Sequence, residues 1–409
     1  MLTLDFINTV AFAGLVLFLG HFVRRFAPFL SRYNVPAPVI GGLVVAVAVT
    51  AARAQGVTLL TFDTRLQAPL MIAFFTTVGF GASLSLLKVG GPQVLVFTLL
   101  CTVLAVLQNV VGAGVAMLLG QHPLFGVLSG SVTLTGGPAT GLAFAPLFEN
   151  AGVVGASTIA VASAMAGIIS GGLIGGPIGT LLVRRNALAR AHTATHTDPP
   201  IATQLVEEQL PDGPTAPPAG EDKESYAILK ALVVILTAMW LGSVVSARLE
   251  GWGLTLPAYI GAMLIASVIR NLDDVTGMIG LSQKTIDDLG NVALSLFLVL
   301  ALMTLRLWEL AGLALPMVVI LVCQVGLIAL VCFWPVFPLM GKDYDAAVMS
   351  GGLCGFMLGT TANAMANMEA LVDRYGPAPR AFLVVPMVGA FFIDFTNGLI
   401  ITFFINLVK

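Results

Sequence analysis

Residues 93–119 read QVLVFTLLCTVLAVLQNVVGAGVAMLL, a stretch without Asp, Glu, Lys, Arg or His. An α-helix of about 20 apolar residues crosses the ~30 Å hydrocarbon core of a bilayer. The stretch therefore predicts a transmembrane helix. The composition agrees, because 57% of the chain is apolar and 10% is charged, whereas soluble domains carry about 25% charged residues.

Similar apolar runs occur on both sides of this stretch. Hydropathy predicts ten spans, near residues 6–23, 38–54, 69–87, 93–119, 153–183, 227–247, 255–270, 289–308, 312–340 and 381–407. The runs do not alternate polar and apolar residues as barrel strands do. The first run lacks a basic leader and a cleavage site, so we expect it to stay as a span. The predicted fold class is an all-α polytopic membrane protein.

A polar segment, 184–226, divides the spans into two sets of five. It contains six prolines and mixed charges with few large apolar side chains, which predicts a flexible linker. The sequence thus predicts an N-terminal half, 1–183, and a C-terminal half, 227–409. Because five is an odd number, the second half is expected to enter the membrane with the opposite orientation.

Loop charges predict the orientation in the membrane. With these spans, 14 of the 19 Lys and Arg residues fall on one side and 5 on the other. Basic loops are retained in the cytoplasm. We therefore expect the linker on the cytoplasmic side of an inner membrane and both termini on the outer, periplasmic side.

The two halves share a weak repeat at an offset of about 221 residues. GQHPLFGVLSGSVTL from Gly120 matches GKDYDAAVMSGGLCG from Gly341 in the order of its Gly and Ser residues, and GASTIA from Gly155 lies over GPAPRA from Gly376. Gln108 over Gln324 is a looser match. Inverted repeats are common in secondary transporters. The alternative is a chance match between two sequences rich in Gly and Ala.

Two glycine-rich segments, 124–150 and 345–369, occupy corresponding places in the halves. Each is too polar for a lipid-facing helix and too short for two full spans, so we predict a re-entrant hairpin in each. Interrupted helices at membrane depth are tolerated where they are buried in protein or line a wet cavity. Their free N–H groups can bind an anion. The alternative is that their small polar residues only pack helices together.

Candidate binding residues follow from these segments. The predicted substrate-binding residues are those with a hydroxyl or amide, or with a glycine at the break: Thr135, Gly136, Gly137, Thr140, Gly359, Thr360, Thr361, Asn363 and Asn367. Arg380, at the start of the last span, is a further candidate for a substrate carboxylate, although it also fits a positive-inside anchor.

Asp394 is the only acidic residue deep in a predicted span, where a charge costs a few kcal/mol or more. Asn397 follows on the same helix face. With Asn367, these residues are the predicted ligands of Na⁺, a cation that oxygen atoms bind. A structural hydrogen bond or a proton carried by Asp394 are the alternatives.

Other classes of function find little support. The sequence has no HExxH motif, no pair of intramembrane Asp and no Ser–His arrangement for an enzyme. The four Cys and four His form no metal-binding pattern, and a net charge of −2 argues against nucleic acid. An ion channel would need a charged ring or filter repeat. A secondary transporter for a small anion, working by alternating access, remains.

The stretches GKDYDAAV from Gly341, FLVVPMVGAFFIDFTN from Phe382 and LRLWELAGLALP from Leu305 resemble the sodium:glutamate symporter family. The resemblance runs from Pro36 to the last span. It implies Na⁺-coupled uptake of glutamate with no organic cofactor, two inverted five-span halves with re-entrant hairpins, and a homodimer with elevator-like transport domains.

The resemblance is weaker in the two hairpins. Pro138 and Leu353 stand where the family has His, Met357 replaces Gly, and Ala362-Asn363 replace Pro-Thr. These changes bear on the substrate. The alternatives are a proton-coupled carrier and a carrier of 2-hydroxycarboxylates or dicarboxylates.

Overall fold

The computed structural model describes residues 2–56, 60–85, 91–188, 223–251, 256–310 and 312–408. Most of the predicted linker falls outside these ranges. Helices dominate the described residues, and two short strands, β1 (Leu2–Thr3) and β2 (Leu60–Thr61), pair in parallel. The predicted all-α polytopic fold class is confirmed.

Eight helices among the described residues are long and apolar enough to cross a membrane. They are α1 (Phe6–Phe26), α3 (Ala37–Ala54), α6 (Gly91–Leu118), α9 (Ala156–Arg185), α11 (Lys223–Glu250), α13 (Gln283–Met303), α14 (Ala314–Val331) continued by η3 (Cys332–Val336) and α15 (Phe337–Leu339), and α18 (Pro379–Met387) continued by η4 (Val388–Phe392) and α19 (Ile393–Val408). Each corresponds to one predicted span.

The other two predicted spans are helices of a different kind. The span expected at 69–87 is α4 (Gln67–Gly81), which has only 15 residues. The span expected at 255–270 is α12 (Ala258–Thr276), which continues into a polar end that includes Arg270, Asp273 and Asp274. Hydropathy detects the apolar part of each helix but not where the helix ends. The two helices pack against each other.

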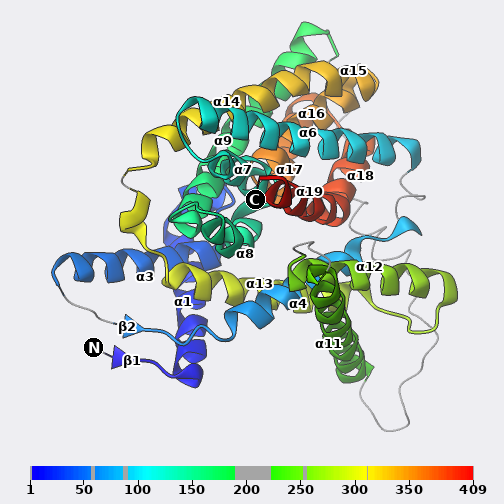
Figure 1. Ribbon diagram of the computed structural model, residues 1–409. Helices are drawn as coiled ribbons and strands as arrows, with labels where there is room; N and C mark the ends of the chain where they lie inside the picture. The colour runs from blue at the N-terminus through cyan, green and yellow to red at the C-terminus, as the bar shows by residue number, and fades with distance from the viewer. Residues whose placement is uncertain are drawn as a thin grey trace.

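The helices form two groups (Figure 1). The first group, in the lower part of the view, contains α1, α3, α4, α11, α12 and α13. The second group contains α6, α9, α14, α15, α18 and α19. It also contains the shorter helices α7 (Pro123–Val127), η1 (Leu128–Val132), α8 (Gly137–Asn150), α16 (Tyr344–Leu358) and α17 (Thr361–Tyr375). Helices contact one another more extensively within a group than between groups. Helices α2 (Pro28–Arg32) and η2 (Leu307–Leu310) are short connections.

Glycines let helices cross closely at two corresponding places in the first group. Gly20 of α1 faces Gly41 of α3, and Gly242 of α11 faces Gly261 of α12. A Cβ atom at any of these positions would overlap with main-chain atoms of the facing helix. Van der Waals packing of small residues is a main source of helix association in membranes. Gly242 follows Gly20 by 222 residues and Gly261 follows Gly41 by 220, so the two pairs are separated by nearly the offset of the sequence match.

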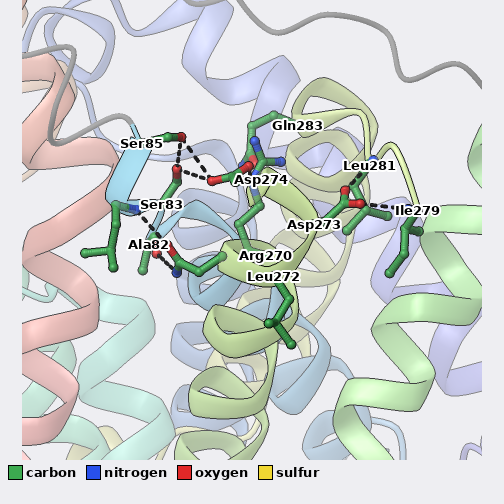
Figure 2. Close-up of polar contacts among 12 residues, drawn as sticks. Ala82, Ser83, Ser85, Arg270, Leu272, Asp273, Asp274, Ile279, Leu281 and Gln283 are labelled. Atoms are coloured by element: carbon green, nitrogen blue, oxygen red, sulfur yellow. Dashed lines mark hydrogen bonds and ion pairs between the residues drawn. The ribbon is translucent and has the colours of Figure 1, made fainter. Parts of the chain in front are cut away.

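A polar cluster at the end of α12 holds the chain segment that leaves α4 (Figure 2). The hydroxyls of Ser83 and Ser85 donate to Asp274 Oδ2, and the Leu84 N–H donates to Asn271 Oδ1 at 2.8 Å. Arg270, whose side chain is buried, forms an ion pair of 2.8 Å with Asp274. We call these contacts of 83–85 with α12 the α12 clamp.

Candidate functional site

The first hairpin, residues 123–150, is built from α7, η1 and α8. His122 caps its start, because His122 Nδ1 accepts a hydrogen bond of 3.2 Å from the Leu124 N–H. The helix is kinked at Gly130, whose φ of −105° and ψ of −131° are not helical. The chain turns at Gly137, where φ is +68°, a value that favours glycine. The predicted segment, 124–150, covers nearly the same residues as these three elements.

The second hairpin, residues 344–375, is built from α16 and α17. Asp343 caps α16 by accepting from the Ala346 N–H at 2.9 Å, and Thr360 caps α17. Gly359 lies at the break between the two helices. The predicted segment, 345–369, ends before the helix does, because α17 continues to Tyr375 and its last residues include Asp373 and Arg374.

The two hairpins begin and end at corresponding positions. His122 and Asp343, which cap the first helix of each hairpin, lie 221 residues apart, as do Gly155 and Gly376, which follow the hairpins with positive φ. This spacing equals the offset of the weak sequence match.

The tips of the hairpins meet. A Cβ atom on Gly137 would lie 3.9 Å from the Gly359 carbonyl oxygen. Gln108 of α6 joins the tips, because its Oε1 accepts from Thr135 Oγ1 at 2.7 Å while its Nε2 donates to the Met357 carbonyl oxygen at 2.9 Å. The structure thus brings together candidate residues from both halves of the chain.

The candidate residues at the tips differ in exposure. Thr135, Gly137, Thr140 and Gly359 are buried, and a Cβ atom on Gly136 would lie 2.5 Å from the Thr140 Cβ. Gly136, Thr360 and Thr361 are only partly buried. The Thr361 hydroxyl donates to the Gly389 carbonyl oxygen at 3.1 Å. Of the candidate residues at the tips, Gly136, Thr360 and Thr361 are therefore the most exposed.

Asn363 and Asn367 contact α9. Asn363 Nδ2 donates to the Ile168 carbonyl oxygen at 2.7 Å, and Asn367 Nδ2 donates to that of Gly171 at 3.0 Å. Both side chains are buried, with Asn363 0% exposed. Their amide donors therefore join hairpin 2 to α9, and among the described residues no hydrogen bond joins Asn367 to Asn397.

Arg380 belongs to α18, and its side chain lies beside the N-terminal end of α16, where the second hairpin begins, and not at the Gly359 break. Its guanidinium pairs with Asp343, the residue that caps α16, and donates to the Met340 carbonyl oxygen. Its main-chain N–H donates to Asp345 Oδ1 at 3.1 Å. The structure therefore gives Arg380 a role in anchoring the hairpin.

Asp394 and Asn397 lie in the first turns of α19, directly after the π-helical turn η4. Asn397 is 0% exposed, and its Nδ2 donates to the Ser131 carbonyl oxygen of hairpin 1 at 3.0 Å. α19 therefore binds hairpin 1 directly, and Asp394 lies one turn before this contact.

Three buried amides of the site were not among the predicted site residues: Gln108 and Asn109 of α6, and Gln324 of α14. Asn109 Oδ1 accepts from the Ser131 N–H at 3.0 Å. The available signal was their polarity, since each lies in an otherwise apolar span. Groups of three or more His, Cys, Asp or Glu side chains that could hold a metal ion are absent from the described residues.

Comparison with known proteins identifies the family. A family model described as sodium/glutamate symporter matches residues 2–377. The sodium/glutamate symporter of Escherichia coli (strain K12) is 40% identical over 408 residues, which cover 100% of this chain and 99% of that relative. The sodium/glutamate symporter of Haemophilus influenzae is 38% identical over 392 residues, 96% of this chain and 95% of that relative. The match extends through both halves of the fold, and the chain belongs to the sodium/glutamate symporter family.

Proposed function

We propose that this protein is an Na⁺-coupled symporter that imports glutamate or a similar small carboxylate across the inner membrane. The observation that supports this most is the meeting of the two hairpin tips, bridged by Gln108, in a chain whose relatives are named sodium/glutamate symporters. Membership in this transporter family also agrees with the expectation that the chain is not an enzyme.

In this proposal the tips form the substrate site. Interrupted helices offer N–H groups and hydroxyls to a carboxylate without burying a fixed positive charge. Gly136, Thr360 and Thr361 are the partly exposed groups that would contact the substrate first. Thr135, Gly137, Thr140 and Gly359 shape the tips from the buried side, and Asn363 and Asn367 set the position of α17.

Alternating access would use the two helix groups. The second group carries both hairpins, and its contacts with the first group are fewer than its internal contacts. Movement of the second group past the first would expose the tips to one side of the membrane and then to the other. We propose that the halves, 1–183 and 227–409, are inverted repeats around the linker 184–226, that each hairpin is re-entrant, and that the linker is cytoplasmic with both termini outside. A homodimer completes this elevator-like arrangement.

The substrate assignment depends on the tip residues. Of the positions that differ from the family pattern, two lie at the tips: Pro138, directly after the turn at Gly137, and Met357, whose sulfur lies 3.8 Å from Thr135 Oγ1. Leu353 is 0% exposed inside α16, and the Asn363 amide is bound to α9. Leu353 and Asn363 therefore affect packing more than substrate contact. Glutamate, which the names of the relatives give, stays the proposed substrate.

Uptake into proteoliposomes tests the proposal. Labelled L-glutamate is offered with an inward Na⁺ gradient, with a pH gradient alone, or with neither, and aspartate, glutamine, citrate and 2-oxoglutarate are added as competitors. Saturable uptake that requires the Na⁺ gradient is expected. Uptake driven by the pH gradient alone would show that the coupling ion is a proton and not Na⁺. Transport of citrate in place of glutamate would show that the substrate is a 2-hydroxycarboxylate. Flux that does not saturate would indicate a channel.

A further inference from the structure

The interruption of hairpin 1 at Gly130 is held by two amides from other helices. Asn109 Oδ1 of α6 accepts the Ser131 N–H at 3.0 Å, and Asn397 Nδ2 of α19 donates to the Ser131 carbonyl oxygen at 3.0 Å. Main-chain polar groups at membrane depth need partners within the protein. Both main-chain polar groups of Ser131, its N–H and its carbonyl oxygen, are therefore bonded to an amide side chain of another helix.

Two oxygen atoms at this position have no hydrogen-bond partner among the residues that the structure describes. They are Ser131 Oγ and Asn397 Oδ1, and both residues are 0% exposed. The amide nitrogen of Asn109 is a third buried atom here without such a partner, and it is a donor. A buried polar atom without a partner costs about 1–3 kcal/mol. Unsatisfied polar atoms of this kind call for a ligand outside the polypeptide, an ion or a water molecule.

The surroundings favour a cation. The side chains that bond to Ser131, Asn109 and Asn397, are neutral, and the neighbouring hydroxyls of Ser129 and Ser163 bond to each other at 3.2 Å. Asp394 lies one turn before Asn397 and carries the nearest acidic group along α19. Hard cations bind oxygen ligands, and interrupted helices commonly provide them.

We propose that Ser131 Oγ and Asn397 Oδ1 are ligands of the transported Na⁺, at the Gly130 interruption between hairpin 1 and α19. Asn109 is a positioning residue, since its oxygen orients Ser131. This inference rests on the proposed function and deepens it, because it names the ion site and separates that site from Asn367, whose Nδ2 contacts α9.

Ser131 also connects the proposed ion site with the proposed substrate site. The Ser131 carbonyl oxygen also accepts the N–H groups of Thr135 and Gly136, at 3.2 and 3.0 Å. An ion that fixes Ser131 therefore fixes the tip at Gly136, where the substrate binds. By linkage, substrate at the tip raises the affinity for the ion by the same factor.

The experiment measures Na⁺ binding without substrate. The unfolding temperature of the purified full-length protein is recorded in NaCl and in choline chloride at equal ionic strength. Na⁺ is expected to raise it for the wild type. Ser131→Ala and Ser131→Cys should lose this shift and require about tenfold more Na⁺ for half-maximal uptake, as expected when one ligand is removed. Ser131→Cys keeps a side chain of similar size if the alanine variant fails to fold.

Ser350→Ala is the matched control. Ser350 is the repeat counterpart of Ser129, it is 0% exposed, and its hydroxyl bonds within its own helix to the Ala346 carbonyl oxygen. It should keep the wild-type response to Na⁺. If both Ser131 variants fold and respond to Na⁺ as the wild type does, the two oxygens bind water only and the inference is wrong while Na⁺-driven uptake stands. If wild-type uptake does not depend on Na⁺, the proposed function itself fails.

Discussion

Gln324 Nε2 of α14 donates a hydrogen bond of 2.6 Å to the main-chain carbonyl oxygen of Gln108 on α6. The two glutamines come from opposite halves of the chain, and both are 0% exposed. Since Gln108 also bonds to both hairpin tips, this contact joins α6, α14 and the two tips into one polar network.

Replacing Gln108 tests this network. Gln108→Ala leaves the Met357 carbonyl oxygen without this donor and the Thr135 hydroxyl with only the Met357 sulfur as acceptor, at about 1–3 kcal/mol for a buried unpaired group. We expect a lower unfolding temperature and uptake reduced about tenfold or more, measured on the same purified protein. Gln55→Ala, at an exposed position, should change neither quantity. Unchanged uptake in Gln108→Ala would mean that the tips keep their arrangement without this bridge.

Asp394 tests the ion requirement. Asp394→Asn keeps the size of the side chain but removes a charge that would offset that of Na⁺, so the variant should insert in the membrane yet lose Na⁺-driven uptake by about tenfold or more. Asp394→Glu should recover part of the activity. Normal coupling to the Na⁺ gradient in Asp394→Asn, measured in proteoliposomes, would exclude Asp394 from ion binding.

Arg380 distinguishes anchoring from substrate binding. Because Arg380 pairs with Asp343 at the start of α16, Arg380→Ala and Asp343→Asn should lower stability by similar small amounts, about 0–1 kcal/mol for a partly exposed pair. The double variant should be no worse than either single variant. The KM for substrate should stay near the wild-type value in all three. A large rise in KM confined to Arg380→Ala would instead place the substrate carboxylate at this residue.

Asp273 makes part of the stability dependent on pH. Burial alone would raise the pKa of Asp273, but the N–H groups of Leu281, Ile279 and Gly280 and the charge of Arg270 outweigh it and lower this pKa below 3.8. A lowered carboxyl pKa adds stability above the unfolded value, and this stability is lost as the pH falls through the folded value.

The comparison with Asp273→Asn measures this contribution. At neutral pH the wild type should unfold at a higher temperature than the variant, because the carboxylate binds three N–H groups. The difference should persist down to about pH 4 and shrink below it. A difference that grows in acid would reverse the assigned direction of the pKa.

Hydropathy was sufficient for most of the fold and insufficient for the site. The apolar runs predicted the eight long helices, and Gly136 and Gly359 marked the hairpin tips, because a run of apolar residues and a glycine at a turn are local properties. The early end of α4 and the polar end of α12 were not predicted, because the polar groups at these helix ends find their partners on neighbouring helices, which hydropathy does not describe.

The buried amide side chains of α6 show most clearly what the sequence could not predict. Gln108 and Asn109 lie in the quoted stretch 93–119, and local sequence does not reveal whether they face Thr135, Ser131 or lipid. Their partners are 22 or more residues away in the chain, at Ser131, Thr135 and Met357. Arg380 had two interpretations in the sequence, and contact with Asp343 favours the anchoring one.

The α12 clamp has a consequence for the proposed movement of the two helix groups, because it lies on the chain segment that connects them. The chain that leaves α4 leads to α6, which belongs to the second group, and it is bonded to α12 at Ser83, Leu84 and Ser85. If the second group moves past the first as proposed, a pull from α6 would reach α12 through Asp274 and Asn271 before it reached the last turn of α4. In such a movement the α12 contacts would carry the force, and the C-terminal end of the short helix α4 would keep its helical hydrogen bonds.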